Sequence, residues 1–231
     1  PDGEKCTQAV IEYKEKIEPS MLGMDTFEVK DRTITGIEME GNKVTLYLDE
    51  KDEEASTLCP GMPWKGTYAS LKEAKVLVQQ KKDIQTQDGR IIRKTDEWIE
   101  SDQTCNKEEE LFIQMAYQNQ NYNLYIPKDY DPRKKYPLVQ FIHDAGACGK
   151  DTRLALAQGT GALVWASPEV QKEHPCFVFA PQFDGPPIVD DEWNVDERLE
   201  DAKVALDNVL DLYSIDRNRI YTTGQSMGCM A

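Results

Sequence analysis

The stretch Arg219-Ile220-Tyr221-Thr222-Thr223-Gly224-Gln225-Ser226-Met227-Gly228 decides how the second half of this chain folds. Its first five residues are rich in β-branched and aromatic side chains, which favour a β-strand. The strand leads directly into Gly-x-Ser-x-Gly, where Gly224 and Gly228 leave room for a sharp turn. The stretch therefore predicts a strand, a tight turn that carries Ser226, and a helix.

The residues before this stretch have the pattern of strands joined by a helical connection. Residues 136–142 and 176–180 are short apolar runs, which predict buried strands. Residues 198–213 carry apolar side chains at helical spacing. Strand, helix and strand in this order imply parallel strands, so we expect residues 108–231 to form an α/β domain with a mostly parallel sheet.

The first part of the chain, residues 1–107, is a series of short alternating segments. Residues 33–39 and 43–48 flank Gly41-Asn42, which predicts a β-hairpin. Only residues 7–17 are a candidate helix. Strands at this spacing predict an all-β immunoglobulin-like sandwich over 1–107, and the polar run 106–110 predicts the linker to the domain at 108–231.

Composition limits the classes of partner. The 231 residues carry a net charge of −15, spread over both halves of the chain, and this argues against nucleic acid and anionic membrane surfaces. No apolar run approaches the roughly 20 residues that cross a bilayer. The six cysteines lack zinc-ligand spacing, and we predict no metal and no cofactor. The first residue is Pro1, and we expect a secreted or cell-surface protein whose signal peptide has been removed.

Ser226 is the candidate nucleophile. A serine hydroxyl attacks poorly at neutral pH unless a base takes its proton and hydrogen-bond donors hold the oxyanion that forms. The backbone amide of Met227 is the predicted first donor. The run 136–142 ends in His143-Asp144-Ala145-Gly146, a loop placed to supply the second donor, which we predict to be the amide of Ala145. The alternative is an ordinary loop and an ordinary turn serine.

Residues 111–231 resemble the N-terminal half of an α/β-hydrolase domain. The resemblance is carried by Tyr136-Pro137-Leu138-Val139 with His143-x-Ala145-Gly146, by Ala180-Pro181-Gln182, and by Ile215-Asp216-x-Asn218-Arg219-Ile220-Tyr221 leading into Gly224-x-Ser226-Met227-Gly228. The chain looks like the esterases grouped with poly(3-hydroxybutyrate) depolymerases and feruloyl esterases, which are similar to the prolyl oligopeptidase family. Some such esterases carry an N-terminal immunoglobulin-like domain, which would correspond to 1–107. The resemblance implies a serine esterase that forms an acyl-enzyme on Ser226 and acts on a small-molecule or polymeric ester.

Two residues depart from the pattern of that family. Where the family has His-Gly, this chain has His143-Asp144, so a carboxylate stands beside the predicted oxyanion hole. Cys229 replaces the glycine that usually follows the turn of residues 224–228, the nucleophile elbow, here called the elbow. Because Cys148 and Cys229 both flank the predicted site, they are either two buried free thiols or a disulfide that ties the loop to the elbow.

The base that should serve Ser226 is not evident in the sequence. In the family the triad runs Ser, then Asp or Glu, then His, so both partners belong downstream of Ser226. The two histidines are His143, whose equivalent in the family is structural, and His174, which we interpret as a surface loop residue. We expect residues 1–231 alone to be inactive and poorly stable, or to be completed by a second polypeptide. Two other functions stay open: a prolyl oligopeptidase-like serine peptidase, and a non-catalytic binding protein with a vestigial hydrolase half.

Overall fold

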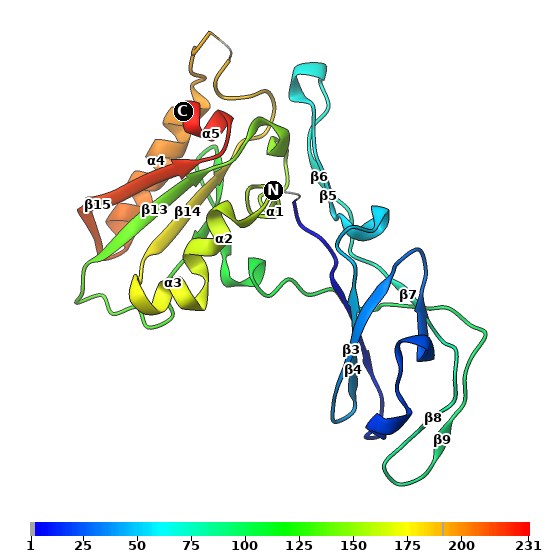
Figure 1. The fold of residues 1–231 in the computed structure, drawn as a ribbon. Helices are drawn as coiled ribbons and strands as arrows, with labels where there is room; N and C mark the ends of the chain where they lie inside the picture. Colours follow the sequence, from blue (N-terminus) through cyan, green and yellow to red (C-terminus); the bar gives the residue numbers. More distant parts are fainter. Residues whose placement is uncertain (1–2, 191) are drawn as a thin grey trace. The chain divides into compact units, whose positions relative to one another are not determined.

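The computed structural model describes residues 3–190 and 192–231, and its contacts divide the chain into two compact units. The larger unit comprises residues 58–72 and 105–231 together with the start of the chain up to Glu4, and the smaller comprises Lys5–Thr57 and Glu73–Thr104 (Figure 1). Both units are discontinuous in sequence, whereas the expected domains 1–107 and 108–231 are continuous. Those domain limits stay a prediction.

The smaller unit contains two three-stranded antiparallel sheets. One has the strand order β1 (Gln8–Glu12), β4 (Lys43–Leu48), β3 (Ile34–Glu40), and the other has β10 (Ile99–Glu100), β7 (Leu77–Gln80), β2 (Phe27–Val29). A short hairpin of β8 (Ile84–Gln85) and β9 (Ile91–Ile92) is also present. Buried side chains of both sheets form one core, which includes Ala9, Phe27, Val29, Val44, Leu46 and Leu48. The core between the sheets makes this unit a sandwich.

The hairpin predicted around Gly41-Asn42 is confirmed, because β3 and β4 pair from Ile34↔Leu48 to Glu40↔Lys43. The helix considered over 7–17 is wrong, because β1 pairs antiparallel with β4. Ala9 is 5% exposed and faces the core, while Val10 is 58% exposed. The sequence hides this alternation because Ala9, Val10 and Ile11 are all apolar.

The larger unit is built on a five-stranded sheet. Its strand order is β11 (Ile113–Tyr117), β12 (Gln120–Tyr125), β14 (Phe177–Gln182), β13 (Tyr136–Ile142), β15 (Ile215–Gly224). β13 runs parallel to both β14 and β15, whereas β12 runs antiparallel to β11 and β14. Two of the four pairings are thus parallel, and the expectation of a mostly parallel hydrolase sheet stays a prediction.

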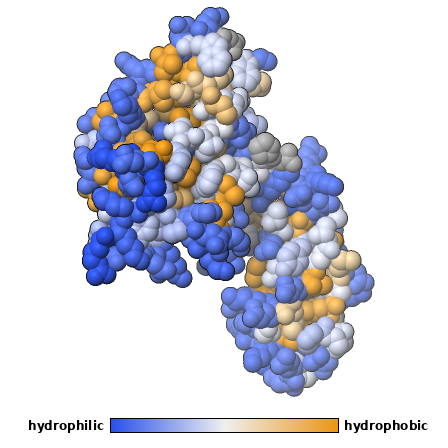
Figure 2. Space-filling view, turned by 60° about the vertical axis from the view of Figure 1, so that its left-hand side comes forward, coloured by the Kyte–Doolittle hydropathy of each residue, from blue (hydrophilic) through white to orange (hydrophobic). Residues whose placement is uncertain are grey.

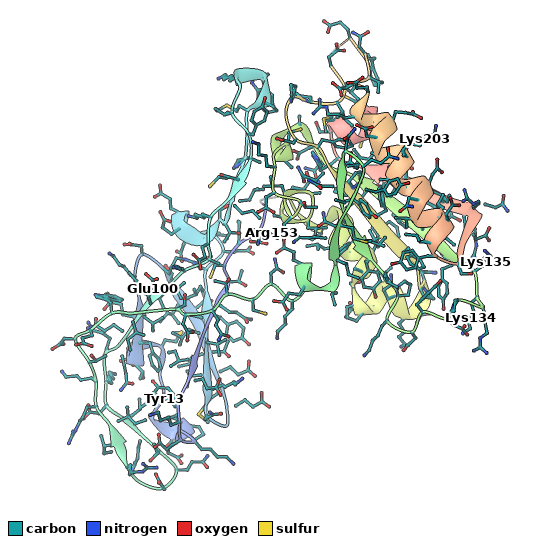
Figure 3. All side chains as sticks on the ribbon, turned by 180° about the vertical axis from the view of Figure 1, so that it is seen from behind. Tyr13, Glu100, Lys134, Lys135, Arg153 and Lys203 are labelled. Atoms are coloured by element: carbon teal, nitrogen blue, oxygen red, sulfur yellow. The ribbon has the colours of Figure 1, made fainter. Side chains whose placement is uncertain are left out.

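Helices cover both faces of this sheet. The connection from β13 to β14 carries α1 (Leu154–Ala157), α2 (Thr160–Ala166) and α3 (Pro168–Glu173), and the connection from β14 to β15 is α4 (Arg198–Leu212). On one face, α1 and α2 pack with Val139 and Phe141 of β13. On the other face, the buried side of α4 packs against Leu138, while Lys203 lies on the exposed side of α4 (Figure 3). The alternating side chains of β13 therefore serve two separate cores.

The surface of both units mixes hydrophobic with hydrophilic side chains (Figure 2), as is usual for folded chains. Among the described residues, no helix combines the length and the apolar character that a membrane crossing requires.

The topology brings two strand ends together. From β13 the chain goes to β14 on one side and then to β15 on the other side. In open α/β sheets, ligands bind beyond the carboxyl ends of the strands at such a switch point. The last residues of β13 and β15, Ile142 and Gly224, lie opposite each other. The loop after β13 and the turn after β15 therefore meet at this edge.

Candidate active site

Ser226 lies in the turn between β15 and the short helix α5 (Met227–Met230). Its backbone has φ 49° and ψ −112°, a conformation that residues other than glycine rarely adopt. The surroundings hold this strained turn in place: Gln225 N donates to Ile142 O at 3.1 Å, and Cys229 N donates to Ser226 O at 2.8 Å. The Ser226 side chain is exposed and caps no amide of α5.

Two glycines make the turn possible. A Cβ atom on Gly224 would lie 2.3 Å from Gly228 O, and a Cβ atom on Gly228 would lie 2.0 Å from Ile142 O. Both positions therefore exclude every side chain, because real Cβ atoms do not approach backbone oxygens this closely. The first turn of α5 packs directly against the end of β13.

The loop of residues 143–149, here named the oxyanion loop after its predicted role, follows β13 and contains the short helical turn η6 (Ala145–Ala147). Its first residue, His143, is fully buried, and both of its ring nitrogens have partners. Phe183 N donates to Nε2 at 3.0 Å, so the proton is on Nδ1, which donates to Asp144 O at 2.7 Å. Burial lowers the pKa of His143 to about 4, so the ring is neutral at neutral pH.

His143 fixes the direction of the Ala145 amide. The C=O of Asp144 and the N–H of Ala145 belong to one planar trans peptide, in which they point in opposite directions. When His143 holds the oxygen of Asp144, it also orients the N–H of Ala145 away from itself. Ala145 begins η6 and Met227 begins α5, and an N–H at the first position of a helix has no acceptor within that helix.

Asp144 does not leave its carboxylate unpartnered in the site. Its Oδ1 accepts from Ala147 N at 3.0 Å, and its Oδ2 accepts from the Gln225 side chain at 3.0 Å. Its own N–H donates to Gln158 Oε1 at 2.9 Å. The departure from the family's His-Gly pattern thus caps η6 and ties the oxyanion loop to the elbow.

Four other carbonyls of the oxyanion loop are also held. Gln182 Nε2 donates to Ala147 O at 2.9 Å and to Gly149 O at 3.1 Å. The carbonyls of Gly146 and Cys148 accept from the backbone of residues 58–72. Met227 belongs to the apolar cluster that contains Cys148, and Ala145 packs against that cluster. The structure thus brings the residues predicted from the sequence (His143, Ala145, Gly146, Gly224, Met227 and Gly228) to the edge where Ser226 lies.

The two cysteines near this edge are both free. Cys148 is buried, and burial raises the pKa of its thiol to about 12. Cys229 is exposed, and its Sγ donates to Gly224 O at 2.9 Å. Of the two arrangements considered, the structure shows free thiols, but Cys229 is exposed rather than buried.

Neither histidine is placed to act as the base of Ser226. Both nitrogens of His143 are occupied. His174 is exposed at the end of α3 and precedes β14, whereas Ser226 follows β15. Because β14 and β15 run in the same direction, the start of one and the end of the other lie at opposite edges of the sheet. Within 3–190 and 192–231, no group of three or more His, Cys, Asp or Glu side chains could hold a metal ion.

Comparison with known proteins identifies the family. Residues 1–93 match the family described as Esterase Ig-like N-terminal domain. The whole chain is similar to the crystal structure of a thermostable esterase, with a TM-score of 0.90 and 31% identity over 100% of this chain and 69% of that one. The chain belongs to this esterase family. No curated protein matches.

Two further solved structures are similar to part of this chain. A feruloyl esterase module from Clostridium thermocellum has a TM-score of 0.39 and 18% identity, over 51% of this esterase and 45% of that chain. A ferulic acid esterase from Anaeromyces mucronatus has a TM-score of 0.36 and 20% identity, over 54% of this esterase and 53% of that chain.

Three glutamines of this esterase support the site but did not stand out in the sequence as site residues. Gln158, Gln182 and Gln225 each hold a different part of the oxyanion loop. Gln182 could be found only as part of the Ala180-Pro181-Gln182 resemblance, and Gln225 as the variable position of Gly-x-Ser-x-Gly. Gln158 lies after α1, which no sequence pattern predicted, so no signal pointed to it.

Proposed function

We propose that this esterase hydrolyses carboxylic esters through an acyl-enzyme on Ser226. The observation that carries the proposal is the strained turn that presents Ser226 at the carboxyl end of β15, beside a loop whose carbonyls are held by other groups. Ser226 Oγ attacks the ester carbonyl carbon as a base takes its proton. The oxyanion accepts from the amides of Met227 and Ala145, and the alcohol leaves with the proton. Water then attacks the acyl-enzyme and releases the acid.

In this proposal the general base and its acidic partner come from outside the described residues. His143 is neutral and fully engaged, and His174 lies at the opposite edge of the sheet. β15 is an edge strand of the described sheet (Figure 1). Tyr221 on this strand is 56% exposed. A further strand, from the same polypeptide or from a second one, has a place to pair there. We therefore propose that residues 1–231 alone are inactive, and that the substrate is a small-molecule or polymeric ester met outside the cell.

The test is hydrolysis of short-chain nitrophenyl esters by the full-length protein, with fluorophosphonate labelling of the nucleophile. Ser226→Ala should lower kcat by about 10⁴-fold or more and abolish labelling. Ser20→Ala, at an exposed serine of the smaller unit, is the matched control and should change neither. Undiminished turnover by Ser226→Ala would refute the proposal. Preference for aminoacyl amides would indicate a peptidase, and substrate binding without turnover would indicate a non-catalytic protein.

A further inference from the structure

The hairpin of residues 58–72 touches the oxyanion loop through its backbone. It consists of β5 (Leu58–Cys59), the helical turn η4 (Pro63–Lys65) and β6 (Ser70–Leu71), and β5 pairs antiparallel with β6. It belongs to the larger unit, although it lies within the residues 1–93 that match the immunoglobulin-like family model. The hairpin therefore comes from the N-terminal part of the sequence but is a structural part of the larger unit.

We propose that this hairpin positions the oxyanion loop for catalysis, an inference that rests on the proposed role of Ala145. Gly61 N donates to Gly146 O at 2.8 Å, and Ala69 N donates to Cys148 O at 2.8 Å. The two bonds grip the carbonyls on either side of Ala147. Together with His143, which holds the carbonyl before Ala145, they restrain η6 from both of its ends.

The contact between hairpin and loop leaves no room for side chains. A Cβ atom on Gly149 of the loop would lie 2.7 Å from Ala69 O of the hairpin. Within the hairpin, a Cβ atom on Gly61 would lie 2.6 Å from Ala69 N, so the two strands are also in close contact with each other. Ala69 itself is only 7% exposed. Backbone packed this closely against backbone fixes the loop more narrowly than flexible side chains would.

Fixing the loop matters because the stabilisation of an oxyanion depends on where the donor points. A donor placed before the reaction does not have to reorganise when the charge develops. A misplacement of about 1 Å can cost about 100-fold in rate. The hairpin is expected to act on the transition state, and much less on the binding of the substrate.

The test uses Ala69→Pro in the full-length protein, because proline lacks the N–H that Cys148 O accepts and places its Cδ atom where that hydrogen was. Tyr68→Pro is the matched control, since the N–H of Tyr68 donates to no acceptor in the described part of the chain. We expect Ala69→Pro to lower kcat by about 10- to 100-fold. The variant should also lower the affinity for a boronic acid, which forms a tetrahedral adduct on Ser226, by a similar factor. KM should change by less than about threefold. Gly149→Ala opens the same contact from the loop side and should show the same pattern.

The outcomes separate the explanations. A lower melting temperature with unchanged kcat and unchanged boronic acid affinity would overturn the inference and leave the hairpin a structural part. A raised KM with unchanged kcat would overturn it in favour of direct substrate contact.

If wild-type protein neither hydrolyses esters nor labels at Ser226, both the proposed function and this inference fail. If wild type is active and both variants match it, this inference alone fails. Hydrogen exchange covers the case of variants that do not fold: the amides of Gly61 and Ala69 should be protected in wild type, and unprotected amides would overturn the inference.

Discussion

Close contacts between backbone atoms restrict the conformation of the turn around Ser226. The positive φ of Ser226 is unfavourable by itself and persists because its neighbours fit in only one way. Gly228 faces Ile142 O, and Gly224 faces the backbone of Gly228. The nucleophile is thus positioned by backbone packing that involves two residues without side chains.

We expect Gly228→Ala to destabilise the protein by about 3 kcal/mol or more, because its Cβ atom would overlap Ile142 O and force β13 and α5 apart. Thermal unfolding and ester hydrolysis measure this effect. Cys229→Ala, at the exposed neighbouring residue, is the control and should stay within about 0.5 kcal/mol of wild type. A Gly228→Ala protein with wild-type stability would show that the turn is looser than described.

His143 predicts a dependence of stability on pH. The pKa of His143 is about 4 in the folded protein and near 6.5 in the unfolded chain. Between these two pH values, the unfolded chain binds a proton at His143 and the folded protein does not. The stabilisation is complete above pH 6.5 and is lost as the pH falls towards 4, on the order of 3 kcal/mol in all. Denaturant unfolding from pH 4 to 8 should show that the free energy of unfolding falls more steeply towards acidic pH for wild type than for His143→Gln. His174→Gln, at an exposed position, should keep the wild-type profile; equal slopes for wild type and His143→Gln would contradict the prediction.

At the scale of elements, β13 organises the larger unit. Its alternate side chains enter two cores, its edges pair with β14 and β15, and its carboxyl end leads into the oxyanion loop. α4 closes one of these cores and delivers the chain to β15. Damage to the packing of α4 therefore acts on the strand that carries Ser226.

Two leucines of α4 allow a matched comparison. Leu210 is 8% exposed and packs in the core, whereas Leu212 is 61% exposed. Leu210→Ala should lower the free energy of unfolding by about 2–5 kcal/mol, because it leaves a cavity under the helix. Leu212→Ala should lower it by about 0.5 kcal/mol or less. Equal losses in chemical denaturation would mean that α4 is rotated relative to the described packing.

At the scale of the whole molecule, the chain has two compact units and six free cysteines distributed over both. Three of the thiols, Cys59, Cys105 and Cys229, are exposed, and two, Cys148 and Cys176, are buried. Burial raises the pKa of both buried thiols and so lowers their reactivity.

Thiol labelling should reflect this distribution. In native protein, Cys59, Cys105 and Cys229 should react with a maleimide reagent, while Cys148 and Cys176 should react only after denaturation. Unreduced, denatured protein should give six thiols in all. Mass spectrometry of labelled peptides measures both, and a shortfall of two thiols that maps to Cys148 and Cys229 would restore the disulfide.

Residue patterns alone were enough to predict the local elements of the larger unit. Residues 136–142 form a strand with the predicted limits, and α4 lies within the predicted helical run. The strand before Gly224 is longer than predicted, because residues 215–218 also belong to β15. Hydrophobic periodicity and the residue preferences of tight turns depend on a few neighbouring residues, so both can be recognised in the sequence.

The surroundings of these elements depend on contacts that form only in the folded chain. The backbone of hairpin 58–72 holds carbonyls some 80 residues further along the chain, and no pattern in the sequence indicated this. Asp144 departs from the family's sequence pattern, and its carboxylate accepts hydrogen bonds from the Gln225 side chain and from an amide of its own loop. Both depend on hydrogen bonds between segments far apart in the chain, and composition and periodicity carry no information about which distant donor meets which acceptor.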